Sequence, residues 1–150
     1  MSQRITGTLR WDHLIRLTGP LGLFEHALYD APRPAHGYTT DDNGRALVVL
    51  AWASPDEVDA TPYLRHVLEA FDGTHFRLRR RMDGQWLEEV SDDATGRAIW
   101  GLGEWIGAGQ GSPEIIEVFE EALRLKTAHP RANAYMLLGA AAAASTGEVR

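Results

Sequence analysis

The sequence predicts an all-α fold in which three helical hairpins form an incomplete α/α toroid with a small β-hairpin insertion. Three observations support this prediction. Amphipathic segments alternate with segments that are apolar nearly all round, a short pattern recurs at a spacing of 52 residues, and glycine and alanine concentrate in the apolar segments. Small residues let inner helices approach closely where they converge on an axis, while amphipathic helices cover them from outside.

The recurring pattern is a gapless match between residues 41–47 and residues 93–99. The same register pairs Phe24 with Phe76, Leu50 with Leu102, Leu64 with Ile116, Val67 with Phe119, Ala70 with Ala122 and Phe71 with Leu123. A fixed period of this size predicts stacked units, each of which buries a face against its neighbour.

The outer helices are expected over residues 56–71 and 113–127, where apolar side chains form one stripe opposite Asp, Glu, Arg and His. Ser112 is suited to the N-cap of the second of these helices, and Pro113 to its first turn. A further helix is expected at about residues 8–18, before a Gly-Pro pair.

The inner helices are expected over residues 44–53, 96–108 and 131–144, and their apolar composition predicts burial on every side. A closed ring of this kind contains about six hairpins, because a repeat array must not leave apolar faces bare. Residues 1–150 therefore form a single partial domain. Either the chain is a fragment of a longer protein or two copies close a ring as a homodimer.

Two long connections, residues 19–43 and 72–93, both lead into the N-terminus of an inner helix and so lie at the same end of the array. Connections of this length in a compact domain are usually functional. The second connection alternates apolar and polar residues around Asp83 and Gly84, which predicts a β-hairpin.

The length, charge and composition of the chain exclude several classes of binding partner. With 150 residues, 44% of them hydrophobic, the chain can bury one core. A net charge of -6 argues against nucleic acid and anionic membranes, which need a basic face. The N-terminus lacks the apolar core of a signal peptide, there is no cysteine, and the longest apolar run, Ala134 to Ala144, is shorter than the roughly 20 residues of a membrane span. We expect a cytoplasmic protein without a cofactor.

The aspartates divide into two kinds. Asp41 and Asp93 share the repeat register, and each precedes an arginine by four residues, Arg45 and Arg97. This spacing predicts ion pairs in the first turn of a helix. Asp42 falls in register with an alanine, so the scaffold does not require an acid there, and we weigh a functional role against a capping role.

A pair of carboxylates suits glycoside chemistry, because one acid protonates the leaving oxygen while the other acts as nucleophile or activates water. The partner of Asp42 is sought among Glu88, Glu89 and Asp92 in the second connection. Trp86 precedes two of these acids and is suited to contact a sugar face. Alternatively, Glu88 and Glu89 are solvated hairpin residues.

His36 and Tyr38 precede Asp42 in the first connection. Both side chains can donate hydrogen bonds to a sugar, and His36 can also transfer protons, although packing under the loop is the alternative. His26 and His36 lack helical spacing and a carboxylate at a recognised offset, so no metal site is expected.

The aromatic and basic groups have structural and binding interpretations. Trp52, Trp100 and Trp105 are expected in the core, with Trp100 one turn from Arg97 and within reach of the axial cavity. The four arginines of residues 77–81 are expected on a solvated face, and binding of a phosphate or uronate is the alternative.

Five motifs carry a resemblance to a known family: Gly-Leu-Phe-Glu-His-Ala at 22–27, His-Gly-Tyr-Thr-Thr-Asp-Asp-Asn-Gly-Arg-Ala-Leu at 36–47, Trp-Leu-Glu-Glu-Val at 86–90, Gly-Arg-Ala-Ile-Trp-Gly-Leu-Gly at 96–103 and Pro-Arg-Ala at 130–132. With these motifs the chain resembles a bacterial helical domain found beside or fused to glycosyltransferases, at about half of its length. The resemblance implies an architecture similar to six-hairpin glycosidases and a carbohydrate ligand near His36, Tyr38, Asp41, Asp42 and Glu88. The chain departs from the family pattern at Ala94 and Thr95, where a more polar pair is expected.

The first functional hypothesis is a glycoside hydrolase-like domain that acts on or binds a glycan at the loop end, with Asp42 and either Glu88 or Asp92 as its acids. Substrate contacts are expected from His36, Tyr38, Asp41, Arg45, Trp86, Glu89, Arg97 and Trp100. The alternatives are a non-catalytic carbohydrate-binding or scaffolding module, and a sugar epimerase or isomerase with His36 as proton carrier. A hydrolase requires two carboxyl groups about 5 to 10 Å apart that face one cleft.

Overall fold

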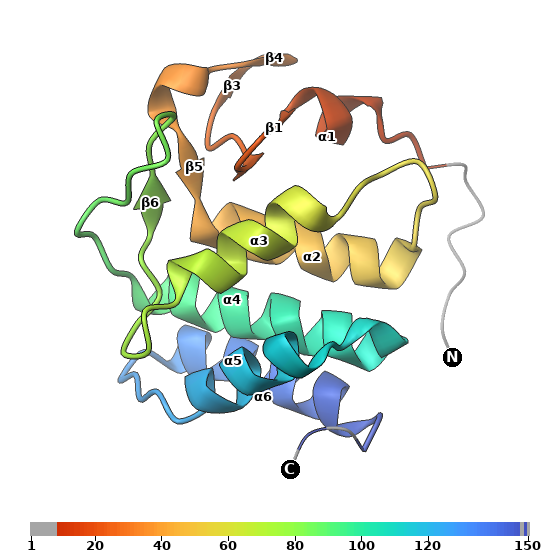
Figure 1. Cartoon of the computed structure of the whole chain (residues 1–150), viewed down its shortest axis with the longest axis vertical. Helices are drawn as coiled ribbons and strands as arrows, with labels where there is room; N and C mark the ends of the chain where they lie inside the picture. Colours follow the sequence, from red (N-terminus) through yellow and green to blue (C-terminus); the bar gives the residue numbers. More distant parts are fainter. Residues whose placement is uncertain (1–8, 148, 150) are drawn as a thin grey trace.

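The computed structural model of the chain describes residues 9–147 and 149, which form a mostly helical fold with short antiparallel β-hairpins (Figure 1). Three inner helices lie side by side in one row: α2 (Thr40–Ala53), α4 (Asp92–Trp105) and α6 (Pro130–Ala144). A one-turn π-helix, η2 (Ile106–Gln110), continues α4. The predicted all-α class and the small β-hairpin insertion are therefore confirmed.

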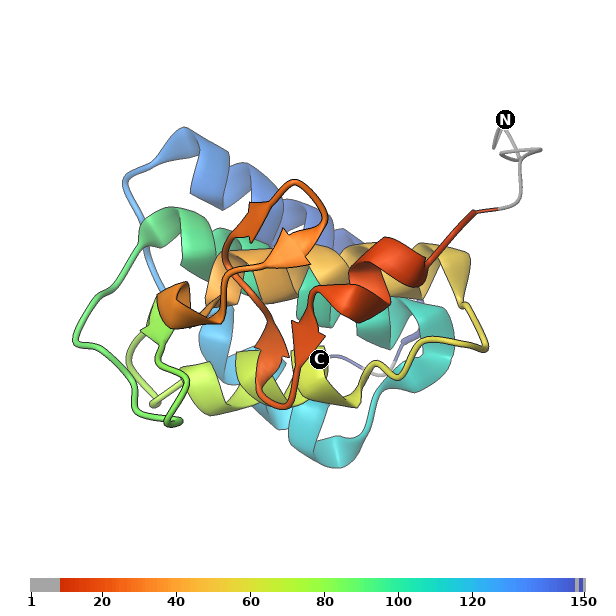
Figure 2. The ribbon, with the colours of Figure 1, turned by 90° about the horizontal axis from the view of Figure 1, so that it is seen from above.

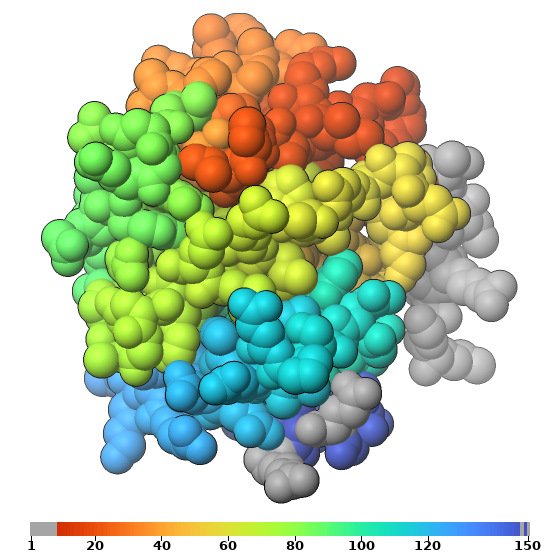
Figure 3. All heavy atoms as spheres, viewed as in Figure 1, coloured from red at the N-terminus to blue at the C-terminus, as the bar shows by residue number. Residues whose placement is uncertain are grey.

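The outer helices α3 (Thr61–Ala70) and α5 (Pro113–Ala122) cover one side of this row, and their segments make up much of the front face in the space-filling view (Figures 1 and 3). The core lies between the two layers. Its largest fully buried side chains include Leu47, Tyr63, Val67, Phe76, Ile99, Leu102 and Phe119. Burial of each such side chain contributes about 1.5 to 3 kcal/mol to folding.

The inner helices touch through their backbones. A Cβ atom added to Gly101 of α4 would lie 2.5 Å from the carbonyl oxygen of Gly44 in α2. A Cβ atom added to Gly139 of α6 would lie 2.5 Å from the carbonyl oxygen of Ile99 in α4. Small residues are thus required where the sequence pattern predicted close approach.

The helix predicted at residues 8–18 is much shorter, and its first residue lies outside the described part. Helix α1 spans only Asp12–Arg16 because the following residues form strand β1 (Thr18–Gly19), which pairs with β2 (Gly22–Leu23). The outer helices are also shorter than predicted. Helix α3 begins at Thr61, whose backbone N–H donates to the Asp59 side chain, and α5 ends at Ala122. Ser112 caps α5 as predicted, since its hydroxyl accepts from the N–H of Ile115.

The expectation that the inner helices are buried on every side is wrong, since even α4 leaves Asp93, Arg97 and Trp100 partly exposed. Helix α4 lies between its neighbours, whereas α6 ends the row and leaves Leu137 70% and Leu138 49% exposed. Helix α2 exposes Val49 and Trp52 on the side of the row away from α3 and α5. Among the described residues, no element covers this face of the row, which we call the uncovered face.

The two long connections meet at one end of the row. The first contains β3 (Ala27–Leu28), β4 (Ala31–Pro32), the short helix η1 (Pro34–His36) and β5 (Tyr38–Thr39), and β5 pairs with β6 (Arg79–Arg80) of the second. The predicted hairpin is present, with bridges from Arg77 to Val90 and from Arg80 to Trp86. Viewed from above, the elements from α1 to β4, which we call the N-terminal segment, lie over α2 and α3 (Figure 2).

No helix in the described part of the chain has the length and apolar character needed to cross a membrane.

Replacement of Gly139 by alanine is expected to lower the free energy of unfolding by about 1 to 3 kcal/mol, the usual cost of overpacking a core. The added methyl group meets the backbone of α4, which cannot move aside as a side chain can. Urea denaturation measures the effect. The control is Ala141→Ser on the exposed side of α6, and equal stability of both variants would contradict the close contact.

Candidate functional site

Asp42 is engaged within the first turn of α2. Its Oδ2 accepts a hydrogen bond of 2.7 Å from the Thr39 hydroxyl, and its Oδ1 forms an ion pair with Arg45. Thr39 occupies the N-cap position of α2 but its hydroxyl accepts no hydrogen bond from the helix backbone, so this contact joins two side chains at the helix start. Both carboxylate oxygens of Asp42 are thus directed to its own helix end.

The three acids expected to partner Asp42 have separate surroundings. Glu88 is exposed and has no hydrogen bond or ion pair with any residue of the described part. Glu89 forms an ion pair with Arg79 at 3.4 Å. Asp92 accepts a 2.6 Å hydrogen bond from the Thr127 hydroxyl, at the edge of a pocket of about 400 Å³ that Asp42 does not line. Within residues 9–147 no contact joins Asp42 to a second acid.

Tyr38 and Trp86 lie beneath the loops. Tyr38 is 1% exposed and stacks on Phe24 with ring centroids 4.8 Å apart. The half-buried Trp86 packs edge-on against His66, 4.9 Å between centroids, and the guanidinium of Arg80 lies 5.1 Å from the centroid of its ring. These two aromatic side chains support the loops and leave little surface for a ligand.

His66 connects the loop segments to α2 and α3. Its Nδ1–H donates to the carbonyl of Leu21 at 2.9 Å, and its Nε2 lies 3.3 Å from the Thr40 hydroxyl, which itself donates to the carbonyl of Arg77. Burial lowers the pKa of His66 to about 4, so the ring is neutral near pH 7. The sequence interpretation placed the histidine of this helix on the polar side. Its i, i+3 spacing from the buried Tyr63 is the signal that indicates burial.

The predicted structural role of Asp41 and Asp93 agrees with the geometry. Asp41 pairs with Arg45 at 3.4 Å and Asp93 with Arg97 at 2.7 Å, each across one turn of its helix. Asp93 also binds Arg131 of α6 at 2.7 Å. Although burial alone would raise it, the two arginines hold the pKa of Asp93 below its ordinary value. Charged pairs therefore line the N-terminal half of the uncovered face.

Three aromatic residues, which we name the aromatic ladder, follow on the same face: Trp52 of α2, Trp100 of α4 and Tyr135 of α6. Trp100 stacks on Tyr135 with centroids 5.3 Å apart and an interplanar angle of 6°, and Trp52 meets Trp100 edge-on at 6.1 Å. The carboxylate of Glu104 accepts both indole N–H groups, at 2.8 Å from Trp52 and 2.9 Å from Trp100. The Arg97 guanidinium lies 4.9 Å from the Tyr135 ring centroid.

The aromatic ladder corrects one sequence expectation. Trp52, expected in the core, is 66% exposed, whereas Trp105 does pack against the core. Glu104 and Tyr135 were not among the expected site residues. The repeat contained a signal for the first of them, because Trp52 and Glu104 are separated by the period of 52 residues and face each other across adjacent units.

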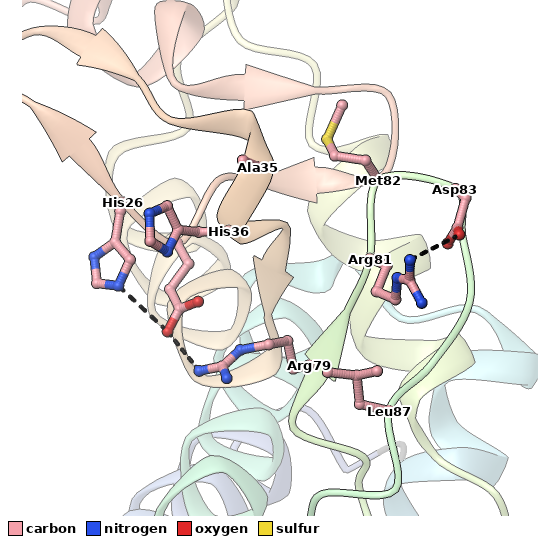
Figure 4. Close-up of a pocket in the computed structure, with 9 residues that line it drawn as sticks. His26, Ala35, His36, Arg79, Arg81, Met82, Asp83 and Leu87 are labelled. Carbon is pink, nitrogen blue, oxygen red and sulfur yellow. Dashed lines mark hydrogen bonds and ion pairs between the residues drawn. The ribbon is translucent and has the colours of Figure 1, made fainter.

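His36 faces a different surface, a pocket of about 740 Å³ between the two long connections. Figure 4 shows it beside His26, with Arg81 and Asp83 on the opposite side of the pocket. The arginines here are paired rather than only solvated: Arg79 donates to Glu25 at 2.7 Å, and Arg81 lies 3.7 Å from an Asp83 oxygen. His36 and Asp42, adjacent in the expected site, thus make contacts with different groups.

The comparisons of the chain with protein-family models, with curated proteins and with solved structures found no match.

The structural role of Asp42 predicts that Asp42→Asn lowers the free energy of unfolding by about 0.5 to 2 kcal/mol, because the ion pair with Arg45 and the favourable interaction of a negative charge with the helix dipole are lost. The matched control is Glu88→Gln, which removes a charge without a partner and is expected to change stability by less than about 0.5 kcal/mol. Both values come from urea denaturation at pH 7. Equal stability of the two variants would show that Asp42 is not structural.

The buried His66 predicts a loss of stability as the pH falls from about 6.5 to about 4. In this window the unfolded chain binds a proton at the histidine and the folded chain does not, so the loss reaches about 3 kcal/mol at pH 4. Carboxylates with lowered pKa, such as Asp93, add their own loss only below about pH 4.

The measurement is the urea unfolding free energy of wild type, His66→Gln and His13→Gln at several pH values. We expect His66→Gln to be less stable at pH 7 and to depend less on pH in this window. His13 lies exposed on α1, so its variant should keep the wild-type slope. An unchanged slope in His66→Gln would exclude His66 as the source of the pH dependence.

Proposed function

We propose that this chain is a non-catalytic carbohydrate-binding domain and that the aromatic ladder is its binding surface. The observation that carries the proposal is the arrangement of Trp52, Trp100 and Tyr135 across three adjacent helices, with Trp52 largely exposed and both indoles held by Glu104. Exposed aromatic side chains are uncommon on a surface without a binding role when they form a contiguous group.

The chemistry of this surface suits a sugar. Aromatic faces pack against the C–H faces of a sugar ring, and a few fixed polar groups set its orientation. Here the polar groups are the Glu104 carboxylate and the guanidinium of Arg97, both beside the ladder. The resemblance to domains associated with glycosyltransferases supports the same class of ligand.

The surroundings of the acids favour binding over hydrolysis. A hydrolase needs two carboxyl groups directed at one cleft. Asp42 is directed at Thr39 and Arg45, and both oxygens of Glu104 accept indole N–H groups, so neither acid is poised to transfer a proton to a ligand. The epimerase alternative, with His36 as proton carrier, has no support from the ladder, because His36 lines the pocket between the two long connections.

We also propose that the row of α2, α4 and α6 is part of an α/α toroid-like array that a second copy of the chain extends at α6. The inner row with its outer cover supports this architecture, and the exposed Leu137 and Leu138 mark its bare edge. The other edge is covered by the N-terminal segment. Because no charged residue occurs from Ala132 to Ala144, two copies of α6 meet without like-charge repulsion.

The Trp52→Ala variant is expected to lose glycan binding by more than about tenfold, since truncation of an aromatic hot-spot side chain costs about 2 kcal/mol or more. The measurement is a glycan-array screen of the purified chain, followed by calorimetric titration with the best ligand. Because Trp52 is exposed, its removal should leave the fold intact, which circular dichroism checks.

The control is Tyr29→Ala, which removes an aromatic side chain that is almost fully exposed elsewhere on the surface. Glycan binding that is equal in wild type and Trp52→Ala would overturn the proposed surface, and the absence of any bound glycan would overturn the proposed ligand class. A mass measurement of the same sample tests the dimer: a monomer at all concentrations contradicts the extension of the array by a second copy.

A further inference from the structure

Three side chains with metal-binding atoms converge at the pocket between the long connections. One ligand atom each from Glu25, His26 and His36 lies within 4.8 Å of the others. Glu25 Oε1 is 3.6 Å from His26 Nε2, and the two imidazole rings meet edge-on with centroids 4.7 Å apart. The sequence interpretation set this histidine pair aside because no carboxylate occurs at a recognised offset, yet the folded chain supplies Glu25.

The backbone fixes the two segments that carry these side chains. The N–H of Glu25 donates to the carbonyl of Gly37 at 2.9 Å, and the N–H of Arg33 donates to the carbonyl of His26 at 2.8 Å. The first of these bonds lies beside His36 and the second at His26 itself. The convergence therefore results from paired backbone segments and not from three freely moving surface side chains.

Arg79 holds the carboxylate of the group. Its Nη2 donates to Glu25 Oε1 at 2.7 Å, and its backbone belongs to β6, which pairs with β5 directly after His36 and Gly37. Figure 4 draws the contacts of His26 and Arg79 with this carboxylate as dashed lines. An outer hydrogen bond to a ligating carboxylate is the usual device that orients it toward a metal ion.

We propose that Glu25, His26 and His36 bind a divalent transition-metal ion, with Zn²⁺ as the fitting example. Two imidazole nitrogens and a carboxylate oxygen are ligands that zinc accepts, and three protein ligands leave one position open. All three residues line the pocket of about 740 Å³, which has room for a further ligand of the ion. Zinc ligands lie about 2.0 to 2.2 Å from the ion, so the exposed histidines rotate inward when it binds.

The test is calorimetric titration of the EDTA-treated full chain with zinc chloride. Wild type is expected to bind one Zn²⁺ per chain. The single variants His26→Ala, His36→Ala and Glu25→Gln should each weaken binding by well over tenfold, because loss of an outer-shell partner alone costs roughly 10- to 100-fold. Visible absorption of the Co²⁺-loaded chain gives a second readout, which should show fewer than six ligands in wild type and the spectrum of hydrated Co²⁺ in the variants.

The matched control is His129→Ala, which removes an exposed histidine that lies 3.5 Å from a single carboxylate, Asp92. This variant should bind Zn²⁺ like wild type. Absence of binding in wild type overturns the proposal. Equal weakening in His129→Ala, or none in His36→Ala, also overturns it, because either result assigns the ion to scattered surface histidines. Circular dichroism of each variant establishes that weakened binding is not caused by unfolding.

Discussion

The backbone contact among α2, α4 and α6 is the constraint on which the rest of the structure depends. Helices that approach this closely leave no room for side chains between them, so the larger side chains of the row must point to one of its two faces. On the covered face they meet α3 and α5 and form the core. On the other face they form the Asp–Arg pairs and the aromatic ladder. The charged and aromatic side chains of the row are therefore accessible to a ligand on that face.

The period of 52 residues places equivalent positions of α2 and α4 beside each other. Asp41 with Arg45 and Asp93 with Arg97 therefore form the same ion pair in successive units, and Trp52 meets Glu104 across the helix boundary. The neutral His66 of α3 holds the first long connection in place, because its Nδ1–H donates a hydrogen bond to the carbonyl of Leu21. The residues of the single site expected at the loop end are therefore separated: Trp100 lies in the ladder, His36 lines the pocket, and Asp42 is engaged in the first turn of α2.

Much of the fold follows from local sequence, and much of the site does not. Apolar periodicity and small residues predict the inner and outer helices, and the Ser112 cap and the Asp–Arg pairs follow from short-range spacing. Periodicity does not show whether a neighbour covers an apolar face, which is why Trp52 and Leu137 were expected to be buried. The meeting of Glu25 with His36 depends on long-range backbone pairing, for which a sequence pattern has no fixed spacing.

The shared acceptor of the two indoles has a thermodynamic consequence. Glu104 restricts the rotamers of Trp52 and Trp100 when the chain folds, so a ligand that stacks on them does not have to order them. Ordering a side chain on binding costs about 0.5 to 1.5 kcal/mol, and here folding has already borne that entropy loss. One carboxylate on α4 thereby couples the stability of the helical row to the rigidity of its exposed face.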